Sequence, residues 1–256
     1  MTDIYARRPT HNLRSLTAAR VSLPMSGHTI ATSDVLELHL AHAQARDAVH
    51  TVFDAEAFTR RLSEELPVLQ EQGVEVLTVH SCAVDRANYL VDPQRGRSLD
   101  AESAAALKPA PCDLAISIAD GLSALAVEKN AIPLLAVLLP RLAEADWALG
   151  PVTVVQQGRV GICDAIGENL GARCSLILIG ERPGLSAADS MGAYLTWEPR
   201  AGRTDADRNC LSNIRSGGLS MEEAAERLME LMKTARAIKL TGVALKEGAV
   251  NSLLEG

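Results

Sequence analysis

The spacing of hydrophobic positions changes near residue 98 of this chain. Upstream, the apolar residues indicate mainly helices, whereas downstream short apolar runs alternate with loops and helical segments. Repeated strand, loop and helix is typical of right-handed crossovers that feed a parallel sheet. The pattern predicts an α/β fold with a Rossmann-like, mostly parallel sheet and flanking helices, preceded by a smaller, mainly helical N-terminal region. We expect an arm over residues 1–30, the helical region over 31–97 and the α/β domain over 98–256.

The N-terminal part begins with a segment that favours neither helix nor strand. Residues 1–30 are interrupted by prolines and glycine and carry several arginines. We expect an irregular arm there, of the kind that often lies across a partner. A first helix should begin at a cap from Ser33 or Asp34 and run to about His50.

A second helix is expected to begin at Asp54, because apolar residues then recur along one stripe. That stripe consists of Phe58, Leu62, Leu66 and Leu69. Pro67 should kink or end this helix. Residues 74–80 then alternate as a half-buried strand would, and Asp92-Pro93 marks a turn.

Four apolar runs in the second half are expected to be strands of the sheet. They cover residues 114–118, 152–155, 175–179 and 193–197. Each run stops at a polar or glycine-containing corner, and ligands of open α/β sheets bind at the carboxyl ends of strands. Residues 176–179 are apolar at every position, which indicates burial on both faces. The stiff corner that follows, with Glu181 and Arg182 ahead of Pro183, therefore indicates a binding loop.

The corners after the first two runs carry further candidates. Asp120 and Ser123 should lie at the carboxyl edge of the sheet beside a helix N-terminus, which could receive an anion or an amide oxygen. The corner Gly158-Arg159-Val160-Gly161 follows the second run. It leads to a short helix from about Asp164, which Gly171 should end in the left-handed conformation.

The fourth run leads to a polar loop over residues 202–213. Around Cys210 this loop gathers many donors and acceptors: Asp207, Arg208, Asn209, Ser212 and Asn213. Such a cluster suits a ligand rich in amides. Simpler interpretations stay open at this point. Cys210 is then a small buried thiol, the polar groups are surface solvation, and Glu181 with Arg182 is a structural ion pair that braces its loop.

The composition argues against several classes of protein. A formal net charge of −7 over 256 residues disfavours a nucleic-acid surface. The longest apolar stretch, residues 131–139, is too short to span a bilayer, and no apolar segment of a secretory signal follows the N-terminal arginines. The five dispersed cysteines indicate reduced thiols. We therefore expect a cytoplasmic protein without a membrane or nucleic-acid partner.

Familiar catalytic and cofactor motifs are missing. No Gly-Lys-Ser/Thr cradle occurs, and residues 158–161 lack the third glycine of a dinucleotide turn, so an independent nucleotide-dependent enzyme is only the alternative interpretation. No Gly-x-Ser-x-Gly elbow indicates a hydrolase. His39, His42 and His50 share a helix, but further ligands are not grouped around them to complete a metal site. We assign no catalytic residue and no metal ligand to this chain.

Several longer motifs together resemble one family. They are His-Ala-Gln-Ala-Arg-Asp at 42–47, Tyr-Leu-x-x-Pro with Gly-Arg over 89–97, Asp-Gly-Leu-Ser at 120–123, Leu-Ile-Gly-Glu-Arg-Pro-Gly-Leu at 178–185, and Asp-Arg-Asn-Cys-Leu-Ser-Asn-Ile-Arg at 207–215. In this order they resemble the small subunit of ethanolamine ammonia-lyase, over a match from about Leu13 to about Lys246. The resemblance implies an adenosylcobalamin-dependent enzyme that converts ethanolamine to acetaldehyde and ammonia by a radical mechanism.

The resemblance also implies a partner and a cofactor site. In that family a large TIM-barrel subunit carries the substrate site, and the small subunit closes over cobalamin at the subunit interface of a hetero-oligomer. The cobalamin contacts of the small subunit fall in three loops, which correspond here to Val160, Glu181 and Cys210. All three positions follow separate predicted strands and should converge at one edge of the sheet, with Arg182 bracing the loop of Glu181. A structural subunit that never touches cobalamin is a further alternative.

Two more expectations follow from the resemblance. No histidine has an aspartate two positions before it, so the Asp-x-His-x-x-Gly motif of base-replacing cobalamin domains is missing, and adenosylcobalamin should bind base-on. Some relatives carry a longer N-terminal extension associated with bacterial microcompartments, whereas this chain begins almost at the arm. We expect a cytoplasmic location, with encapsulation in a bacterial microcompartment through the large subunit as the alternative.

Overall fold

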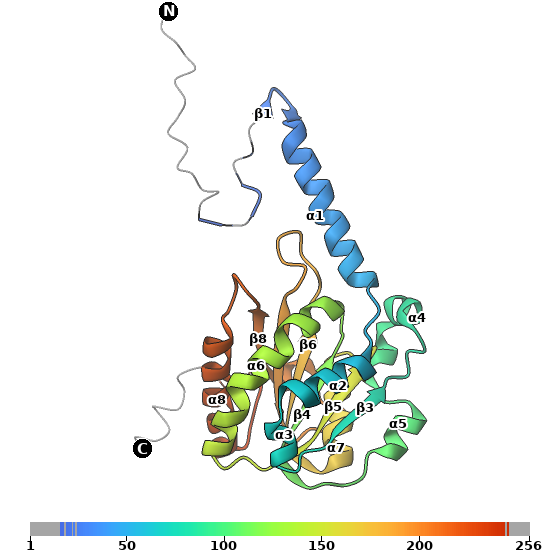
Figure 1. The fold of residues 1–256 in the computed structure, drawn as a ribbon, viewed down its shortest axis with the longest axis vertical. Helices are drawn as coiled ribbons and strands as arrows, with labels where there is room; N and C mark the ends of the chain where they lie inside the picture. Colours follow the sequence, from blue (N-terminus) through green and yellow to red (C-terminus); the bar gives the residue numbers. More distant parts are fainter. Residues whose placement is uncertain (1–15, 18, 22, 24, 244, 246–256) are drawn as a thin grey trace, which may run out of the picture.

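The chain folds around a central β-sheet with helices on both faces. The computed structural model describes residues 16–17, 19–21, 23, 25–243 and 245. Figure 1 shows α2, α6 and α8 lying across the sheet, while α1 extends away from this body. The predicted α/β class, with a mostly parallel sheet behind a helical N-terminal region, is confirmed.

The elements follow one another with short connections. The helices are α1 (Thr32–His50), α2 (Ala55–Glu65), α3 (Val68–Glu71), α4 (Arg86–Val91), η2 (Pro93–Arg97), α5 (Ala101–Ala106), α6 (Ala124–Glu144), α7 (Ile162–Leu170), η3 (Asp205–Asp207) and α8 (Met221–Ile238). The strands are β1 (Met25–Ser26), β2 (Thr29–Ile30), β3 (Val76–His80), β4 (Cys112–Ala119), β5 (Leu149–Gln156), β6 (Ala172–Gly180), β7 (Met191–Trp197) and β8 (Arg208–Ile214).

The main sheet has six strands in the order β3-β5-β4-β6-β7-β8. Strands β3, β5, β4 and β6 are parallel, whereas β7 and β8 join the β6 side with antiparallel pairing. Each of the four apolar runs predicted as strands lies within β4, β5, β6 or β7, and the alternating segment is β3. Because β7 runs against β6, the chain returns along β8 toward the edge where the parallel strands end.

The sheet is buried on both faces. On one face, α2, α6 and α8 cover side chains such as Leu114 and Leu176. On the other face, α7 packs over Val155 and Ile177. This double burial explains why β4 and β6 are apolar almost throughout, the pattern by which the sequence predicts them.

The N-terminal region shares the sheet and the core of the rest of the chain. Asp54 caps α2 through a hydrogen bond from the Ala57 amide, and α2 ends at Glu65, two residues before Pro67. The apolar stripe beyond this cap, Phe58, Leu62, Leu66 and Leu69, is buried in the main core. Strand β3 pairs with β5. The division of the chain into domains near residue 97 stays a prediction.

The expected cap of the first helix is wrong, and the expected irregular arm is wrong over residues 25–30. Helix α1 begins at Thr32 after Ala31, which makes no side-chain cap hydrogen bond, so neither Ser33 nor Asp34 is its cap. Within the predicted irregular arm, β1 and β2 form a hairpin, because Gly27 adopts a φ of +63° in the two-residue turn. The arm residues Arg7, Arg8 and Arg14 lie outside the described residues.

The predicted polar loop over residues 202–213 is also partly wrong. Residues 208–214 form the edge strand β8, which pairs with β7 along most of its length. An edge strand is exposed along one side, so polar residues are tolerated there and its composition resembles that of a loop. Cys210 therefore lies within a strand.

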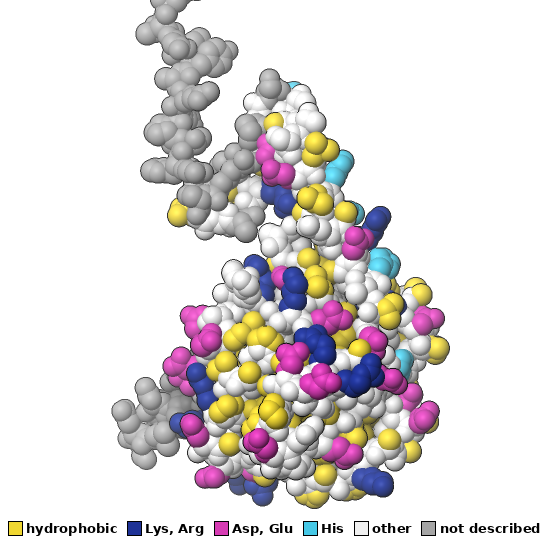
Figure 2. Space-filling view, in the orientation of Figure 1, with side chains coloured by type: hydrophobic (Ala, Val, Ile, Leu, Met, Phe, Trp, Pro, Cys, Tyr) yellow, Lys and Arg dark blue, Asp and Glu magenta, His cyan; other side chains and the backbone are white. Residues whose placement is uncertain are grey.

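Helix α1 is exposed along most of its length. Leu36 and Leu40, one turn apart, keep 62% and 60% of their side chains accessible. Figure 2 shows apolar and histidine side chains along this helix, among charges of both signs that continue over the body below it. Arg20 links the helix to the body, because its guanidinium donates to the Glu37 and Leu185 carbonyl oxygens.

Candidate functional site

A cavity of about 430 Å³ lies where the parallel strands end. Its lining comes from the ends of β4, β5 and β6 and from α4, η2 and β7: Tyr89, Pro93, Gly121, Leu122, Arg159, Val160, Ile179, Gly180, Glu181, Arg182 and Tyr194. After β4 the chain turns to α6 on one face, and after β5 it turns to α7 on the other. Such a divergence opens a crevice at the carboxyl edge of an α/β sheet. We call this hollow the carboxyl-edge cavity.

Two glycines allow the loop after β4 to lie directly against the end of β6. Gly121 has a φ of +54°, which disfavours any residue with a side chain. A Cβ on Gly121 would clash with the Gly180 carbonyl, and a Cβ on Gly180 would clash with the Ser123 carbonyl. The Leu122 amide donates to the Gly180 carbonyl at 2.9 Å. This close backbone contact fixes one wall of the cavity.

The loop after β5 is held by the segment around α4. The Tyr89 hydroxyl donates to the Gly158 carbonyl at 3.2 Å, and the Arg159 amide donates to the Gly96 carbonyl at 2.7 Å. Burial, and then the nearby Asp120 carboxylate, raises the pKa of Tyr89 to about 12, so its phenol is a neutral donor at physiological pH. These contacts fix a second wall of the cavity.

A buried ion pair joins the same two loops. Asp120 is only 1% exposed, and it accepts a hydrogen bond from the Gly158 amide at 3.1 Å. Its other oxygen lies 3.5 Å from the Arg86 guanidinium, which also donates to the Gly121 carbonyl at 2.6 Å. Burial raises the pKa of Asp120 to about 6, although Arg86 acts in the opposite direction. The carboxylate is therefore mostly ionised at neutral pH.

Glu181 connects the ends of three strands. Its amide donates to the carbonyl of Ser190, which directly precedes β7. Its carboxylate oxygen Oε2 accepts from the Ser190 hydroxyl at 2.5 Å and from the Asn213 amide of β8 at 3.2 Å. The other oxygen, Oε1, accepts no hydrogen bond from the described residues. Glu181 is therefore held in place with one oxygen left for a ligand.

Cys210 reaches the cavity through its neighbour Tyr194. The two residues are partners in the ladder between β7 and β8, and Tyr194 lines the cavity. The Cys210 thiol is exposed and lies 3.3 Å from the Ser212 hydroxyl. Burial raises the pKa of Tyr194, and the neighbouring Cys210 and Glu181 side chains raise it further. Cys210 thus lies beside the lining rather than in it.

Two arginines of the lining have uncommitted guanidinium groups. Arg159 and Arg182 make no ion pair and no side-chain hydrogen bond within the described part of the chain. The predicted ion pair between Glu181 and Arg182 is therefore wrong there, as is the expectation that Arg182 braces the loop. Glu181 makes the bracing contacts itself, through Ser190 and Asn213. The two free cations suit amide or phosphate oxygens.

The similarity of this chain to known proteins extends over nearly its whole length. A family model described as the ethanolamine ammonia-lyase light chain matches residues 7–246. The chain belongs to this light-chain family. The match confirms the resemblance drawn from the motifs, over almost the same range.

Curated relatives of the light-chain family agree. An ethanolamine ammonia-lyase small subunit from Pseudomonas putida (strain W619) is 49% identical over 243 residues, which cover 93% of this chain and 87% of the relative. The protein of the same name from Pseudomonas syringae pv. tomato is 47% identical over 253 residues, with 96% and 86% covered. That from Pseudomonas aeruginosa (strain UCBPP-PA14) is 47% identical over 262 aligned positions, with 100% and 93% covered.

In this member of the light-chain family, the structure brings two of the three predicted contact positions into one lining. Val160 and Glu181 both line the carboxyl-edge cavity, and Cys210 lies one ladder step beyond Tyr194. Tyr89 and Tyr194 were not among the residues predicted for the site. For Tyr194, an available signal was a phenol between the apolar residues Ala193 and Leu195, since a partly buried hydroxyl needs a partner.

The predicted anion site at the start of α6 is already occupied by the protein's own groups. Ser123 caps the helix by accepting from the Ala126 amide at 3.2 Å, and its hydroxyl donates to the Ala188 carbonyl at 2.9 Å. Asp120 is committed to Gly158 and Arg86. Both residues lie at the predicted edge of the sheet, but their role is to hold loops together.

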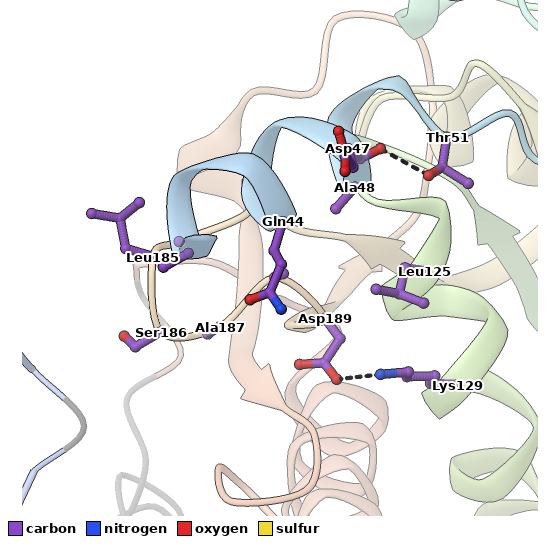
Figure 3. Close-up of a pocket in the computed structure, with 13 residues that line it drawn as sticks. Gln44, Asp47, Ala48, Thr51, Leu125, Lys129, Leu185, Ser186, Ala187 and Asp189 are labelled. Carbon is purple, nitrogen blue, oxygen red and sulfur yellow. Dashed lines mark hydrogen bonds and ion pairs between the residues drawn. The ribbon is translucent and has the colours of Figure 1, made fainter. Parts of the chain in front are cut away.

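A second cavity, of about 480 Å³, lies between α1, the start of α6 and residues 184–189. Figure 3 shows Gln44 of α1 and Asp189 on opposite sides of it, with Lys129 paired to Asp189 at 3.0 Å. This hollow shares the loop that follows Glu181 but contains none of the predicted contact residues. Because none of its lining residues belongs to a strand of the sheet, we regard the carboxyl-edge cavity as the candidate site.

The described residues offer neither a metal-binding cluster nor a membrane-spanning helix. They contain no group of three or more histidine, cysteine, aspartate or glutamate side chains that could hold a metal ion. The alternative of a metal site around His39 and His42 therefore gains no support. None of the helices in the described part has both the length and the apolar character that a membrane crossing requires.

Proposed function

We propose that this chain is the cobalamin-binding small subunit of an ethanolamine ammonia-lyase, which uses adenosylcobalamin to convert ethanolamine to acetaldehyde and ammonia by a radical mechanism. Its relatives are named small subunits of that enzyme, so a large subunit is the expected partner in a hetero-oligomer. The carboxyl-edge cavity carries the cofactor part of the proposal. It holds Val160 and Glu181 in one lining, with Cys210 adjacent.

The chemical groups of the cavity fit the edge of a cobalamin. A corrin is a broad, largely apolar ring whose rim bears amides, and its nucleotide tail bears a phosphate. Val160 offers apolar contact, and Oε1 of Glu181 can accept from an amide N–H. Arg159 and Arg182 can donate to amide or phosphate oxygens. The donors, acceptors and apolar surface required are therefore present together.

The residues of this chain bind and shield the cofactor. When bound, adenosylcobalamin supplies the radical chemistry of the reaction. Glu181, anchored by Ser190 and Asn213, fixes the orientation of the ring, and Tyr194 with Val160 excludes water from its side. The large subunit covers the opposite side of the cofactor and provides most of the contacts to ethanolamine. No catalytic acid, base or nucleophile is required of the small subunit.

Base-on binding and a cytoplasmic location belong to the same proposal. The sequence lacks an Asp-x-His-x-x-Gly motif, so the cofactor keeps its own dimethylbenzimidazole on cobalt. Encapsulation in a bacterial microcompartment through the large subunit is the alternative location. Electron paramagnetic resonance of the Co(II) form of cobalamin in the complex tests whether the benzimidazole coordinates cobalt. Nitrogen-15 in the benzimidazole alters the hyperfine pattern only if that base is bound to the metal.

Reconstitution from separate subunits tests the main proposal. Three preparations are compared: this chain alone, this chain together with a cognate large subunit, and the large subunit alone. Acetaldehyde formation from ethanolamine and the cobalamin absorption spectrum are then followed. We expect turnover and a spectral change only when both subunits and adenosylcobalamin are present. Turnover by this chain alone contradicts the binding role, and full turnover by the large subunit alone shows that the small subunit is dispensable.

A further inference from the structure

Arg86 of α4 connects the end of α1 to the loop after β4, beside the carboxyl-edge cavity. Its Nε donates to the Val49 carbonyl at the end of α1, at 2.7 Å. Its Nη1 donates to the Gly121 carbonyl at 2.6 Å and lies 3.5 Å from the Asp120 carboxylate. The guanidinium also lies over the Tyr89 ring, 5.1 Å from its centroid. One side chain of α4 thus contacts both the end of α1 and the loop after β4.

Asp120 extends this connection to the loop after β5. Its carboxylate accepts a hydrogen bond from the amide of Gly158, and Gly158 lies two positions before Val160. The Gly121 end of the network is equally close to the site, because the next residue, Leu122, lines the cavity. Arg86 and Asp120 lie outside the lining themselves. Their contacts join the wall after β4 to the wall after β5.

The network requires the shape of arginine as well as its charge. The two carbonyl oxygens of Val49 and Gly121 are bound through different nitrogens of one planar guanidinium. A lysine ammonium keeps the charge opposite Asp120, but it is a point donor and does not reproduce this fork. Exchange of Arg86 for lysine therefore separates geometric positioning from charge neutralisation.

We propose that Arg86, acting through Asp120 and Gly121, is a positioning residue that sets the separation of the cavity walls for the cofactor. The inference rests on the proposed cobalamin function, which it deepens by naming a residue that never touches the ligand. Figure 1 shows α4 beside the end of α1 where this network lies. Loss of the network widens the walls without removing any contact residue.

Arg236 of α8 provides a matched control at the other end of the sheet. It donates to the Ala145 and Asp146 carbonyls, pairs with Asp113 at 2.8 Å, and lies 3.9 Å from the centroid of the Trp147 ring. It therefore makes the same kinds of contact as Arg86: two carbonyls, one aspartate and one aromatic ring. Asp113 belongs to the start of β4, whereas Asp120 follows its end.

The test compares Arg86→Lys and Arg236→Lys in the complex with the large subunit. We expect Arg86→Lys to raise the apparent KM for adenosylcobalamin about tenfold, the effect of losing one charge-assisted hydrogen bond. The kcat at saturating adenosylcobalamin should stay close to that of the wild type. Arg236→Lys should leave this KM unchanged. A purely structural role of Arg86 would lower the amount of active enzyme, and so kcat, without a change in KM.

A second measurement needs no cofactor. Amide hydrogen exchange of the full chain follows Leu122 and Gly158, whose amides are bonded to Gly180 and Asp120. Both amides should exchange faster in Arg86→Lys and not in Arg236→Lys. Unchanged exchange, an unchanged KM, or an equal rise of KM in both variants overturns the positioning role. If the wild-type complex does not bind cobalamin, the proposed function fails, and exchange still decides whether Arg86 holds the walls.

Discussion

Tyr194 of β7 stands opposite Cys210 of β8, and on its other side it pairs with Ile177 of β6. The tyrosine lines the carboxyl-edge cavity, whereas the cysteine lies on the exposed edge strand beside it. A single ladder step therefore brings Cys210 within reach of a ligand that also contacts Glu181. A broad ligand is needed to contact both positions.

The thiol of Cys210 should become protected when cobalamin binds. Two of the five cysteines, Cys82 and Cys210, are exposed in the chain. We expect iodoacetamide to modify both in the complex without cofactor, and to modify Cys82 alone once adenosylcobalamin is present. Mass spectrometry of tryptic peptides measures the extent at each site. Equal labelling of Cys210 with and without the cofactor would contradict its place in the cobalamin site.

The buried cysteines provide an internal standard for that experiment. Burial raises the pKa of Cys163 to about 12 and also raises the pKa of Cys174. Because the thiolate is the reacting form, these thiols should remain unmodified in the folded protein. Their labelling would report unfolding, so it separates loss of structure from true exposure of Cys210.

Replacement of Glu181 should weaken cofactor binding and slightly destabilise the fold. In Glu181→Ala, the Ser190 hydroxyl and the Asn213 amide lose their acceptor. We expect the free energy of unfolding to fall by about 1 kcal/mol, and the apparent Kd for cobalamin in the complex to rise about tenfold. Urea denaturation and cobalamin titration measure the two effects.

Glu65→Ala on α2 is the matched control for Glu181, because Glu65 is exposed and pairs with Arg61 on the surface. This control should change the apparent Kd for cobalamin little. An unchanged Kd in Glu181→Ala would favour the alternative in which the chain is a structural subunit and cobalamin touches only its partner.

The backbone contact between the loop after β4 and the end of β6 should tolerate no side chain. In Gly180→Ala, the new Cβ would meet the carbonyl oxygens of Asp120 and Ser123. Because both are backbone atoms, relief requires the loop to move, and we expect a loss of about 2 kcal/mol or more in stability. Gly184→Ala is the control, since its nearest neighbouring atom lies at 3.8 Å. Equal thermal stability of the two variants would contradict this account of the loop.

The inner strands of the sheet could be predicted because burial on both faces makes their local sequence apolar. Leu176 to Ile179 are apolar at each position, and only a strand covered on both faces needs this pattern. Strand β8 lacked such a signal. Its exposed residues Ser212 and Asn213 resemble those of a loop, and it is a strand because β7 offers it a free edge.

The network of Arg86 lay beyond sequence reasoning for a different reason. Val49, Gly121 and Asp120 are distant from Arg86 in the chain, and the fold alone brings their oxygen atoms around one guanidinium. No residue spacing or sequence motif indicates that these oxygen atoms surround Arg86. Glu181 could be predicted as a site residue from its strand-end position, but its contacts with Ser190 and Asn213 depend on the antiparallel return of β7 and β8.

The raised pKa of Asp120 predicts a pH-dependent stability with a definite sign. Burial raises the pKa of this carboxyl to about 6 in the folded protein, above its ordinary value of 3.8. The native state therefore binds the proton more tightly than the unfolded chain. Between pH about 6 and about 4, acidification should stabilise the wild type relative to Asp120→Asn, by up to about 3 kcal/mol in total. Above pH 6 the difference between the two proteins should level off.

Urea denaturation of the wild type and of Asp120→Asn over this pH range measures that difference. The amide of the variant does not titrate, so the subtraction cancels the contributions of all other groups that keep their environment. Asp113→Asn, at the start of the strand that Asp120 follows, corrects for the general effect of replacing a carboxylate by an amide. A difference that is constant with pH would mean that Arg86 and burial cancel at Asp120. A relative stability of the wild type that falls on acidification would mean that Arg86 stabilises the charge of Asp120 more than burial opposes it.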